Sequence, residues 1–340
     1  MWSLIARQSG LVGAWRLKGV CWASHQGVEE WLRTLPGLVR CGGSEDWLCA
    51  SKVWRLDLAT LQWGAMPVLM TARKEHACCT VRGALVVLGG YINTAMRGVK
   101  EMTSTVEILS VGAVGFTSLP SLSCGGIAGA FAIAVEESNS AAGQVLLIGG
   151  HDGWGGMLSM VDLVDLATGT CTPQPATIYR RAHFTAVRIP DGRVVCGGGN
   201  PDWIVTNSAE VWGSPEGEGP SAVWTELPAM SVGRMRCCGC VMSDGRFAVL
   251  GGNTNKGGAG SVHSSFEVLN LGEHAYWTLL APMHHERFDF ACAAVARCII
   301  VAGGSSQKSE VYDEDCGRWL QLPCNCPDDV RLDDMGSALM

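Results

Sequence analysis

Five arginines occur at matching places in the sequence, and each leads into a short apolar run, as in "RKEHACCTV" and "RRAHFTAV". They are Arg73, Arg181, Arg234, Arg287 and Arg331. A guanidinium group can bind a carboxylate or a phosphate through two parallel hydrogen bonds. Five such groups around one opening would bind an acidic or phosphorylated peptide. Alternatively, each arginine pairs with a carboxylate or a loop carbonyl of its own chain and holds neighbouring segments together.

Aromatic side chains occur in turn-rich stretches that follow a repeated Gly-Gly pair, such as "SEDWL", "HDGWGG" and "NPDWIV". They are Trp47, Tyr91, Trp154 and Trp203, and His151 lies in the same kind of stretch. Arginine and tryptophan dominate the hot spots of protein interfaces. We therefore expect these aromatics and the five arginines to form one partner-binding face, although the aromatics could instead pack against adjacent loops.

Patterns typical of metal binding and catalysis are weak. The adjacent pair His284–His285 is a poor chelate on a strand, because neighbouring side chains point to opposite faces. The "CCGC" and "CNC" clusters lack the two well-separated pairs of a structural zinc site. The sequence has no phosphate loop, nucleophile elbow or H-E-x-x-H motif. We therefore expect no metal, no cofactor and no catalysis.

The composition favours short strands joined by tight turns. The 340 residues include 44 glycines and 13 tryptophans, and only 17% are charged. The net charge of −7 argues against nucleic acid as a partner. Apolar runs are shorter than the roughly 20 residues of a membrane span. Most of the 16 cysteines lie in apolar runs, and no export signal is evident, so we expect a cytoplasmic or nuclear protein with free thiols.

A repeat with a period near 50 residues organises the chain. Double glycines end six short runs, for example "VVLGGY", "LLIGGH" and "IVAGGS". Each is followed by a second strand-like run, which in five of the six units carries an early acidic residue: Glu107, Asp162, Glu210, Glu267 and Glu310. An aromatic and a Leu/Met-Pro element follow, and an arginine then opens the next apolar run. Each unit is predicted to form four short strands, the blade of a β-propeller.

With these landmarks the sequence from about residue 37 to 340 resembles the kelch family. The resemblance implies a six-bladed all-β propeller, in which the Gly-Gly pair and the tryptophan are structural. We expect the glycines to offer the tryptophan ring a backbone without side chains to pack on. In relatives, one face of the ring commonly holds a peptide segment of a partner protein. Copper oxidases of this type use tyrosine and histidine clusters, which the four tyrosines here do not form with histidine.

The two ends of this region complement each other. The terminal run "RLDDMGSALM" matches the first strand of a unit, whereas "LVRCGG" at 38–43 is a second strand that no first strand precedes. We therefore predict that the C-terminal strand pairs with the N-terminal strands and closes the ring.

Residues 1–36 differ in pattern from the rest of the chain. Apolar residues recur at helical spacing between Leu17 and Leu32, and Pro36 follows. The segment "WRLKGVCWASHQGVEEWLRTLP" resembles the C-terminal part of an F-box, although the proline-led first helix is missing. The alternative is a helical cap that folds over one face of the propeller.

The most concrete hypothesis is a non-catalytic propeller that captures a partner peptide on its Arg/Trp-rich face. The F-box resemblance implies a substrate receptor of a ubiquitin ligase, with a Skp-type adaptor and a cullin as partners. The alternative is an enzyme or small-molecule binder with its site at the channel mouth. A peptide binder should show a broad, shallow basin rimmed by arginine and tryptophan. An enzyme should show a deeper pocket in which several titratable groups converge.

Overall fold

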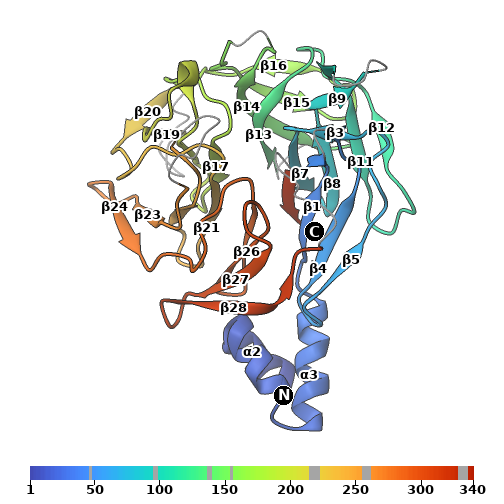
Figure 1. Ribbon diagram of the computed structural model, residues 1–340, viewed down its shortest axis with the longest axis vertical. Helices are drawn as coiled ribbons and strands as arrows, with labels where there is room; N and C mark the ends of the chain where they lie inside the picture. Colours follow the sequence, from blue (N-terminus) through green and yellow to red (C-terminus); the bar gives the residue numbers. More distant parts are fainter. Residues whose placement is uncertain are drawn as a thin grey trace.

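The computed structural model describes residues 1–45, 48–94, 99–135, 140–153, 156–213, 223–254, 262–327 and 336–340. These residues are mostly strands, preceded by three short helices, and the strands form antiparallel four-stranded sheets arranged around a common axis (Figure 1). The architecture is therefore that of an all-β propeller, as the sequence predicts. No helix in the described part of the chain is long and apolar enough to cross a membrane.

Each four-stranded sheet is built in the order that the repeat predicts. From the axis outwards the sheets are β29 (Gly336–Leu339), β1 (Leu38–Cys41), β4 (Val53–Asp57), β5 (Gln62–Ala65); β7 (Ala77–Val81), β8 (Ala84–Leu88), β11 (Val106–Leu109), β12 (Thr117–Leu119); β13 (Ala128–Val135), β14 (Gln144–His151), β15 (Val161–Asp165), β16 (Cys171–Pro173); β17 (Thr185–Arg188), β18 (Val194–Gly197), β19 (Ala209–Trp212), β20 (Trp224–Leu227); β21 (Cys238–Val241), β22 (Phe247–Leu250), β23 (Phe266–Asn270), β24 (Tyr276–Leu280); and β25 (Ala291–Val295), β26 (Cys298–Ala302), β27 (Lys308–Asp313), β28 (Arg318–Asn325).

Further short strands lie in the loops that connect the strands of these sheets. They are β2 (Ser44–Glu45) with β3 (Leu48–Cys49), and β6 (Arg73–Lys74) with β9 (Tyr91–Asn93) and β10 (Lys100–Met102). A short 3-10 helix, η1, covers Pro201–Trp203.

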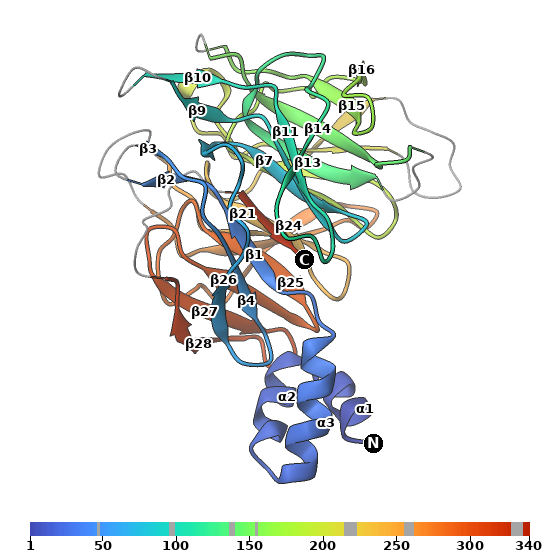
Figure 2. The same cartoon turned by 90° about the vertical axis from the view of Figure 1, so that its right-hand side faces the viewer.

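The innermost strands form a closed ring. They contact one another in the order β7, β13, β17, β21, β25, β29 and back to β7. β29 comes from the C-terminus and pairs antiparallel with β1, with Leu339 opposite Leu38 and Gly336 opposite Cys41. The C-terminus accordingly lies beside β1 (Figures 1 and 2). The predicted pairing of the two ends is present, and through it the terminal strand is covered by a partner strand.

Strand burial follows from position in the ring. The second strands, such as β8 and β26, are buried at every residue, because both of their faces meet neighbouring sheets. The inner strands are rich in small residues, as in "ACCTV" and "ACAAV", which suits the crowded axis. The core of the described residues is thus divided into several apolar clusters between adjacent sheets.

We expected the double glycines to provide a packing surface for a tryptophan ring. At Gly149 and Gly150 they instead allow the backbones of two adjacent sheets to approach closely. Gly149 has φ +62°, and a Cβ added there would lie 2.4 Å from the carbonyl oxygen of Arg181 in the next sheet. The N–H of Gly150 donates to that same oxygen at 2.7 Å. The nearest neighbours are therefore backbone and Phe184, not a tryptophan ring. Glycine is required because the backbones of two sheets approach closely in a left-handed conformation.

The tryptophans of the fourth strands instead link adjacent sheets through their indole N–H groups. Trp224 donates to the carbonyl oxygen of Pro175 at 2.9 Å, and Trp277 donates to that of Pro228 at 2.7 Å. A proline that closely follows the fourth strand of one unit thereby accepts the indole N–H of the next unit's tryptophan.

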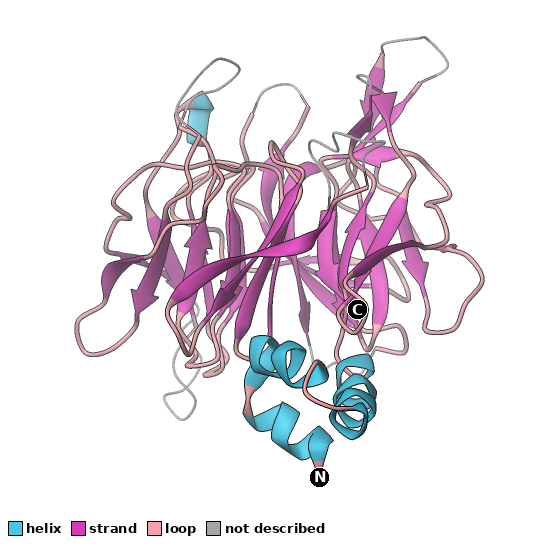
Figure 3. Cartoon of the chain, turned by 60° about the horizontal axis from the view of Figure 1, so that its bottom comes forward, coloured by secondary structure: helices cyan, strands magenta, loops and turns pink. Residues whose placement is uncertain are grey.

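The N-terminal region forms three helices: α1 (Trp2–Gln8), α2 (Gly10–Lys18) and α3 (Trp22–Arg33). Cys21 caps α3, and its N–H donates to the hydroxyl of Ser24 at 2.9 Å. The helices lie under one side of the ring (Figure 3) and share a continuous apolar core with β4, β25 and β26. The indole N–H of Trp15 donates to the carbonyl oxygen of Leu58 at 2.8 Å, at the turn between β4 and β5.

Candidate functional site

Four of the predicted partner-binding arginines are buried. Arg73, Arg181, Arg234 and Arg287 are each 0% exposed. Each forms an ion pair with the acidic residue on the third main strand of its own repeat unit, and the N–O distances are 2.5–2.7 Å. The partners are Glu107, Glu210, Glu267 and Glu310. The prediction that these arginines contact a partner is therefore wrong, and the alternative of internal pairing is correct.

The surroundings of Arg181 show why the sequence buries it. Its guanidinium donates to Glu210, to the carbonyl oxygen of Gly198 at 2.6 Å and to the hydroxyl of Ser208 at 2.9 Å. Glu210 also accepts the N–H of Ile178 at 2.6 Å. One arginine thus joins the first strand, the double glycine and the third strand of a sheet, and a fully bonded charge is tolerated in the interior.

The other predicted site residues have different outcomes. Arg331, Trp47 and Trp154 lie outside the described residues, and only the backbone of Trp203 is described, within η1. Tyr91 is half-buried on β9, and its ring lies 5.7 Å from the ring of His151. Of the predicted set, Tyr91 is thus the residue that the structure brings next to a cluster of titratable groups.

That cluster arises from the residue two positions after each of the four described arginines, and from Gly129, the equivalent residue of the unit that lacks this arginine. Glu75, Gly129, His183, Arg236 and Asp289 all adopt a left-handed conformation with φ between +50° and +65°. Their backbones are joined in sequence: each N–H from Gly129 to Asp289 donates to the carbonyl oxygen of the preceding member at 2.7–3.1 Å. This unusual conformation costs free energy for residues other than glycine, and such strain is concentrated at functional sites. The equivalent residue of the remaining unit, Asp333, lies outside the described residues.

We call these five residues the channel ring. All five line a cavity of about 180 Å³ that extends along the inner strands to Cys78, Cys238 and Cys292. Four of the five have ionisable side chains. Arg236 pairs with Asp289 at 2.6 Å, whereas Glu75 pairs with histidines.

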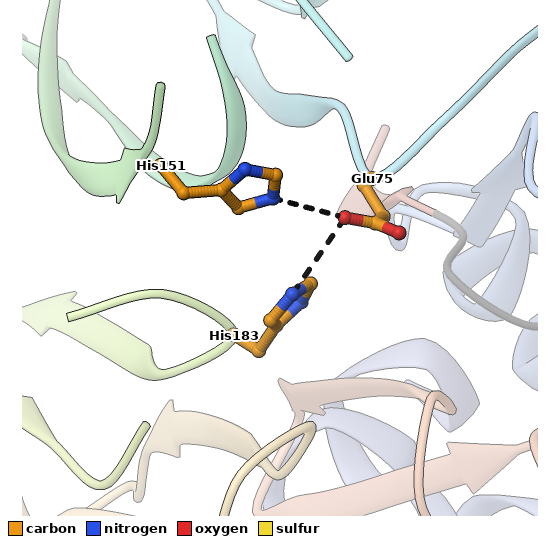
Figure 4. A group of neighbouring side chains, drawn as sticks. All are labelled: Glu75, His151 and His183. Atoms are coloured by element: carbon orange, nitrogen blue, oxygen red, sulfur yellow. Dashed lines mark hydrogen bonds and ion pairs between the residues drawn. The ribbon is translucent and has the colours of Figure 1, made fainter. Parts of the chain in front are cut away.

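Glu75, His151 and His183 converge at this ring (Figure 4). The Oε2 atom of Glu75 lies 3.2 Å from Nε2 of His151 and 3.6 Å from Nε2 of His183. The other carboxylate oxygen, Oε1, lies 3.2 Å from Nζ of Lys74. All three side chains of the cluster are at most 15% exposed.

The electrostatics of the cluster favour an ionised carboxylate. Burial by itself raises the pKa of Glu75, but the hydrogen bond with His151 and the charges of His183, Lys74 and Arg236 outweigh it. The pKa of Glu75 is therefore held below its usual range. Burial and the nearby Glu75 carboxylate raise the pKa of Tyr91, so its phenol stays protonated.

A thiol pair lies close to the same channel. The Sγ atom of Cys41 is 3.4 Å from Nε2 of His76, and both side chains are buried. A hydrogen bond with Cys78 and the proximity of His76 lower the pKa of the Cys41 thiol, whereas the same pairing raises the pKa of Cys78. All cysteines are free, as the sequence predicts.

A second group of possible metal ligands, Cys124, Asp162 and Cys171, lies away from the axis, where β15 pairs with β16. The two sulfur atoms are 3.2 Å apart, and Cys124 is exposed. Burial, followed by the hydrogen bond to Cys171, raises the pKa of Cys124 to about 12. This thiol is therefore protonated at neutral pH.

Comparison with known proteins supports the fold. No protein-family model and no curated protein matches the chain. A solved structure described as "Structure of YjhT" matches with a TM-score of 0.67 at 13% sequence identity, over 85% of this chain and 98% of that one. At this identity the likeness shows a shared all-β propeller-like fold and nothing about activity.

The sequence also contains a signal for the channel ring, which our prediction of the partner-binding arginines did not use. In "RKEH", "RAHF", "RMRC" and "RFDF" the second residue after the arginine is charged or histidine each time. A neutral structural position would not hold four different titratable residues. The recurring arginines are structural, whereas the variable residue two positions after each of them lines the cavity.

Proposed function

We propose that this chain is a six-bladed kelch-type propeller that binds a small polar molecule at the mouth of its central channel. The observation that carries the proposal is the channel ring, because strained backbone there directs Glu75, His183, Arg236 and Asp289 into one cavity. A deeper pocket with converging titratable groups favours a ligand site over a shallow peptide basin.

The cavity limits the ligand. Its volume of about 180 Å³ is below the roughly 300–1,000 Å³ of pockets for drug-sized ligands, so the ligand is compact. Arg236 offers donors, whereas Glu75 and Asp289 offer acceptors. We therefore expect a compact molecule that carries both hydrogen-bond donors and acceptors.

Further polar residues stand in the loops that follow the double glycines, outside the lining of the cavity. The residue directly after each double glycine is polar: Ser44, Tyr91, His151, Asn200, Asn253 and Ser305. Asn200 is 2% exposed, and its Oδ1 has no hydrogen-bond partner among the described residues. Buried polar atoms in folded proteins are nearly always bonded, so a ligand or water that supplies a donor there is expected.

The test is ligand-observed NMR with a library of compact polar molecules. We expect molecules that bind the wild type and fail to bind Arg236→Ala. Arg246→Ala is the matched control, because Arg246 pairs with Asp244 outside the cavity, and it should bind as the wild type does. If every molecule that binds the wild type also binds Arg236→Ala equally well, the channel site is refuted.

We also propose, as a second candidate, that the N-terminal helices dock a partner protein, as the F-box resemblance implies for a Skp-type adaptor. The supporting observation is that Leu4, Val20 and Trp22 are 59–74% exposed on a helical unit whose opposite side is buried. Trp22→Ala should abolish copurification of an adaptor and a cullin with the tagged chain. Trp212→Ala, on the propeller, is the control.

A further inference from the structure

We propose that Glu75, His151 and His183 bind one divalent first-row transition-metal ion at the channel mouth. The inference rests on the proposed function, since the ion would lie in the cavity that receives the polar molecule and could bind it directly. Glu75 and His183 line that cavity, and His151 faces them from β14.

The distances suit a shared ion. Metal–nitrogen and metal–oxygen bonds in such sites are about 2.0–2.2 Å, so neighbouring ligand atoms at 90–109° are about 3.0–3.5 Å apart. Oε2 of Glu75 is 3.2 Å and 3.6 Å from the two histidine nitrogens. All three candidate ligand atoms lie within 4.8 Å of one another. Small rotations of the side chains would bring them around one ion.

The backbone holds the ligands in place. Glu75 follows β6, His151 ends β14 and His183 precedes β17, so the ligands come from three consecutive sheets of the ring. Gly129 links two of them, because its N–H donates to the carbonyl oxygen of Glu75 at 2.8 Å and its carbonyl accepts from His183 at 3.1 Å. Ligands on a rigid scaffold lose little entropy when they bind an ion.

Neighbouring groups orient the ligands as outer-shell residues do in metal sites. Lys74 occupies Oε1 of Glu75 and leaves Oε2 for the two imidazoles. The rings of Tyr91 and His183 flank His151, with centroids 5.7 Å and 5.8 Å away.

The donor set indicates the class of ion. Two imidazoles and one carboxylate suit zinc or iron(II), whereas magnesium and calcium prefer all-oxygen sites. Three protein ligands leave coordination positions open, as in catalytic rather than structural sites. Those positions would face the cavity, where a hydroxyl or carboxylate group of the polar molecule could bind.

The first test is titration of the full chain with Co²⁺, followed by its visible spectrum and by calorimetry. We expect one equivalent to bind without the intense charge-transfer band of cobalt–thiolate bonds. Glu75→Gln and His183→Ala should weaken this binding at least 10-fold, whereas His274→Ala, which removes an exposed histidine outside the channel, should not. Equal affinity in the wild type and in both ligand variants would overturn the proposal.

A second measurement needs no channel variant and therefore does not depend on the variants folding. X-ray absorption of the Zn²⁺-loaded chain, carrying Cys124→Ser to disable the peripheral thiol group, should show only nitrogen and oxygen ligands. Sulfur ligands, or no bound zinc, would overturn the metal site. The two proposals can be tested separately. If the chain binds no metal but still binds polar molecules by NMR, only the metal site is refuted. If the metal-loaded chain binds none of the polar molecules, the proposed function is refuted.

Discussion

The buried ion pair of Arg181 and Glu210 predicts a large and specific loss of stability. Glu210→Ala removes a carboxylate that is 0% exposed and accepts from both Arg181 and the backbone N–H of Ile178. The guanidinium would keep only the carbonyl oxygens and hydroxyl around Gly198 and Ser208. An uncompensated buried charge costs about 3–5 kcal/mol, and the unpaired amide adds about 1 kcal/mol. We therefore expect the free energy of unfolding to fall by at least about 4 kcal/mol.

The assay is equilibrium unfolding in urea, monitored by tryptophan fluorescence. The free energy of unfolding should decrease by about 2–3 kcal/mol per molar urea. The urea midpoint of Glu210→Ala should therefore lie about 1–2 M below that of the wild type. Asp244→Ala is the matched control, because it breaks the exposed pair with Arg246, which contributes about 0–1 kcal/mol. The double variant Arg181→Met/Glu210→Leu should recover much of the loss, because replacing both charges leaves neither unpaired.

The result that would refute this reasoning is a Glu210→Ala variant within about 1 kcal/mol of the wild type. So small a loss of stability would mean that the Arg181 guanidinium reaches water or another anion. Arg181 would then again be a candidate for binding a partner. Under the present geometry, reversing Arg181 to Glu places two carboxylates together in the interior and should unfold the ring. It cannot serve as a clean test of binding.

Three further predictions concern the closure and the channel. Deleting residues 336–340 removes β29 from β1, and at about 1 kcal/mol per hydrogen bond the free energy of unfolding should fall by roughly 3–5 kcal/mol; an unchanged melting temperature would contradict the closure. Because the folded pKa of Glu75 is lowered, its contribution to stability is present above the unfolded value near pH 4.3 and is lost as the pH falls through the folded value. The stability difference between the wild type and Glu75→Gln should therefore shrink as the pH falls below about 4, and a difference that stays the same in acid would argue against it. The lowered pKa of Cys41 predicts a thiolate absorbance near neutral pH that disappears in Cys41→Ser, and identical ultraviolet titrations would exclude it.

Much of the fold follows from local chemistry that the sequence displays. Double glycines, arginines and third-strand acids recur because each unit must make the same backbone approach and the same ion pair. The pairing of β29 with β1 was predictable, since a first strand and a second strand were each incomplete alone. The three-helix arrangement was only partly predictable: a helical pattern over Leu17–Leu32 gave no sign of the break before α3, where Cys21 acts as the cap.

The site was predicted less well, because side-chain direction in the turn before each inner strand depends on backbone conformation. A residue in extended backbone at Arg181 would have pointed its guanidinium out of the ring. Instead, the carbonyl oxygen of Arg181 accepts from Gly150 in the neighbouring sheet, and its side chain turns towards Glu210. Positive φ at His183 then turns the next accessible side chain towards the axis. Hydropathy does not show such a reversal within two residues, and its sequence signal is confined to the titratable residue that stands two places after each of four arginines.

This arrangement explains how one repeat can serve both structure and binding. The arginine, the glycines and the third-strand glutamate are the same in most units, because every sheet needs the same internal network. The position two residues later joins its neighbours around the ring through backbone hydrogen bonds, while its side chain pairs with other groups at the cavity. The shared backbone network therefore does not prescribe which side chain stands there. Glutamate, glycine, histidine, arginine and aspartate can therefore occupy equivalent places without altering the fold. In the five units whose ring position is described, one variable residue per unit lines the same cavity. Changes at Glu75 or His183 should therefore alter binding at the channel mouth while the sheets remain intact.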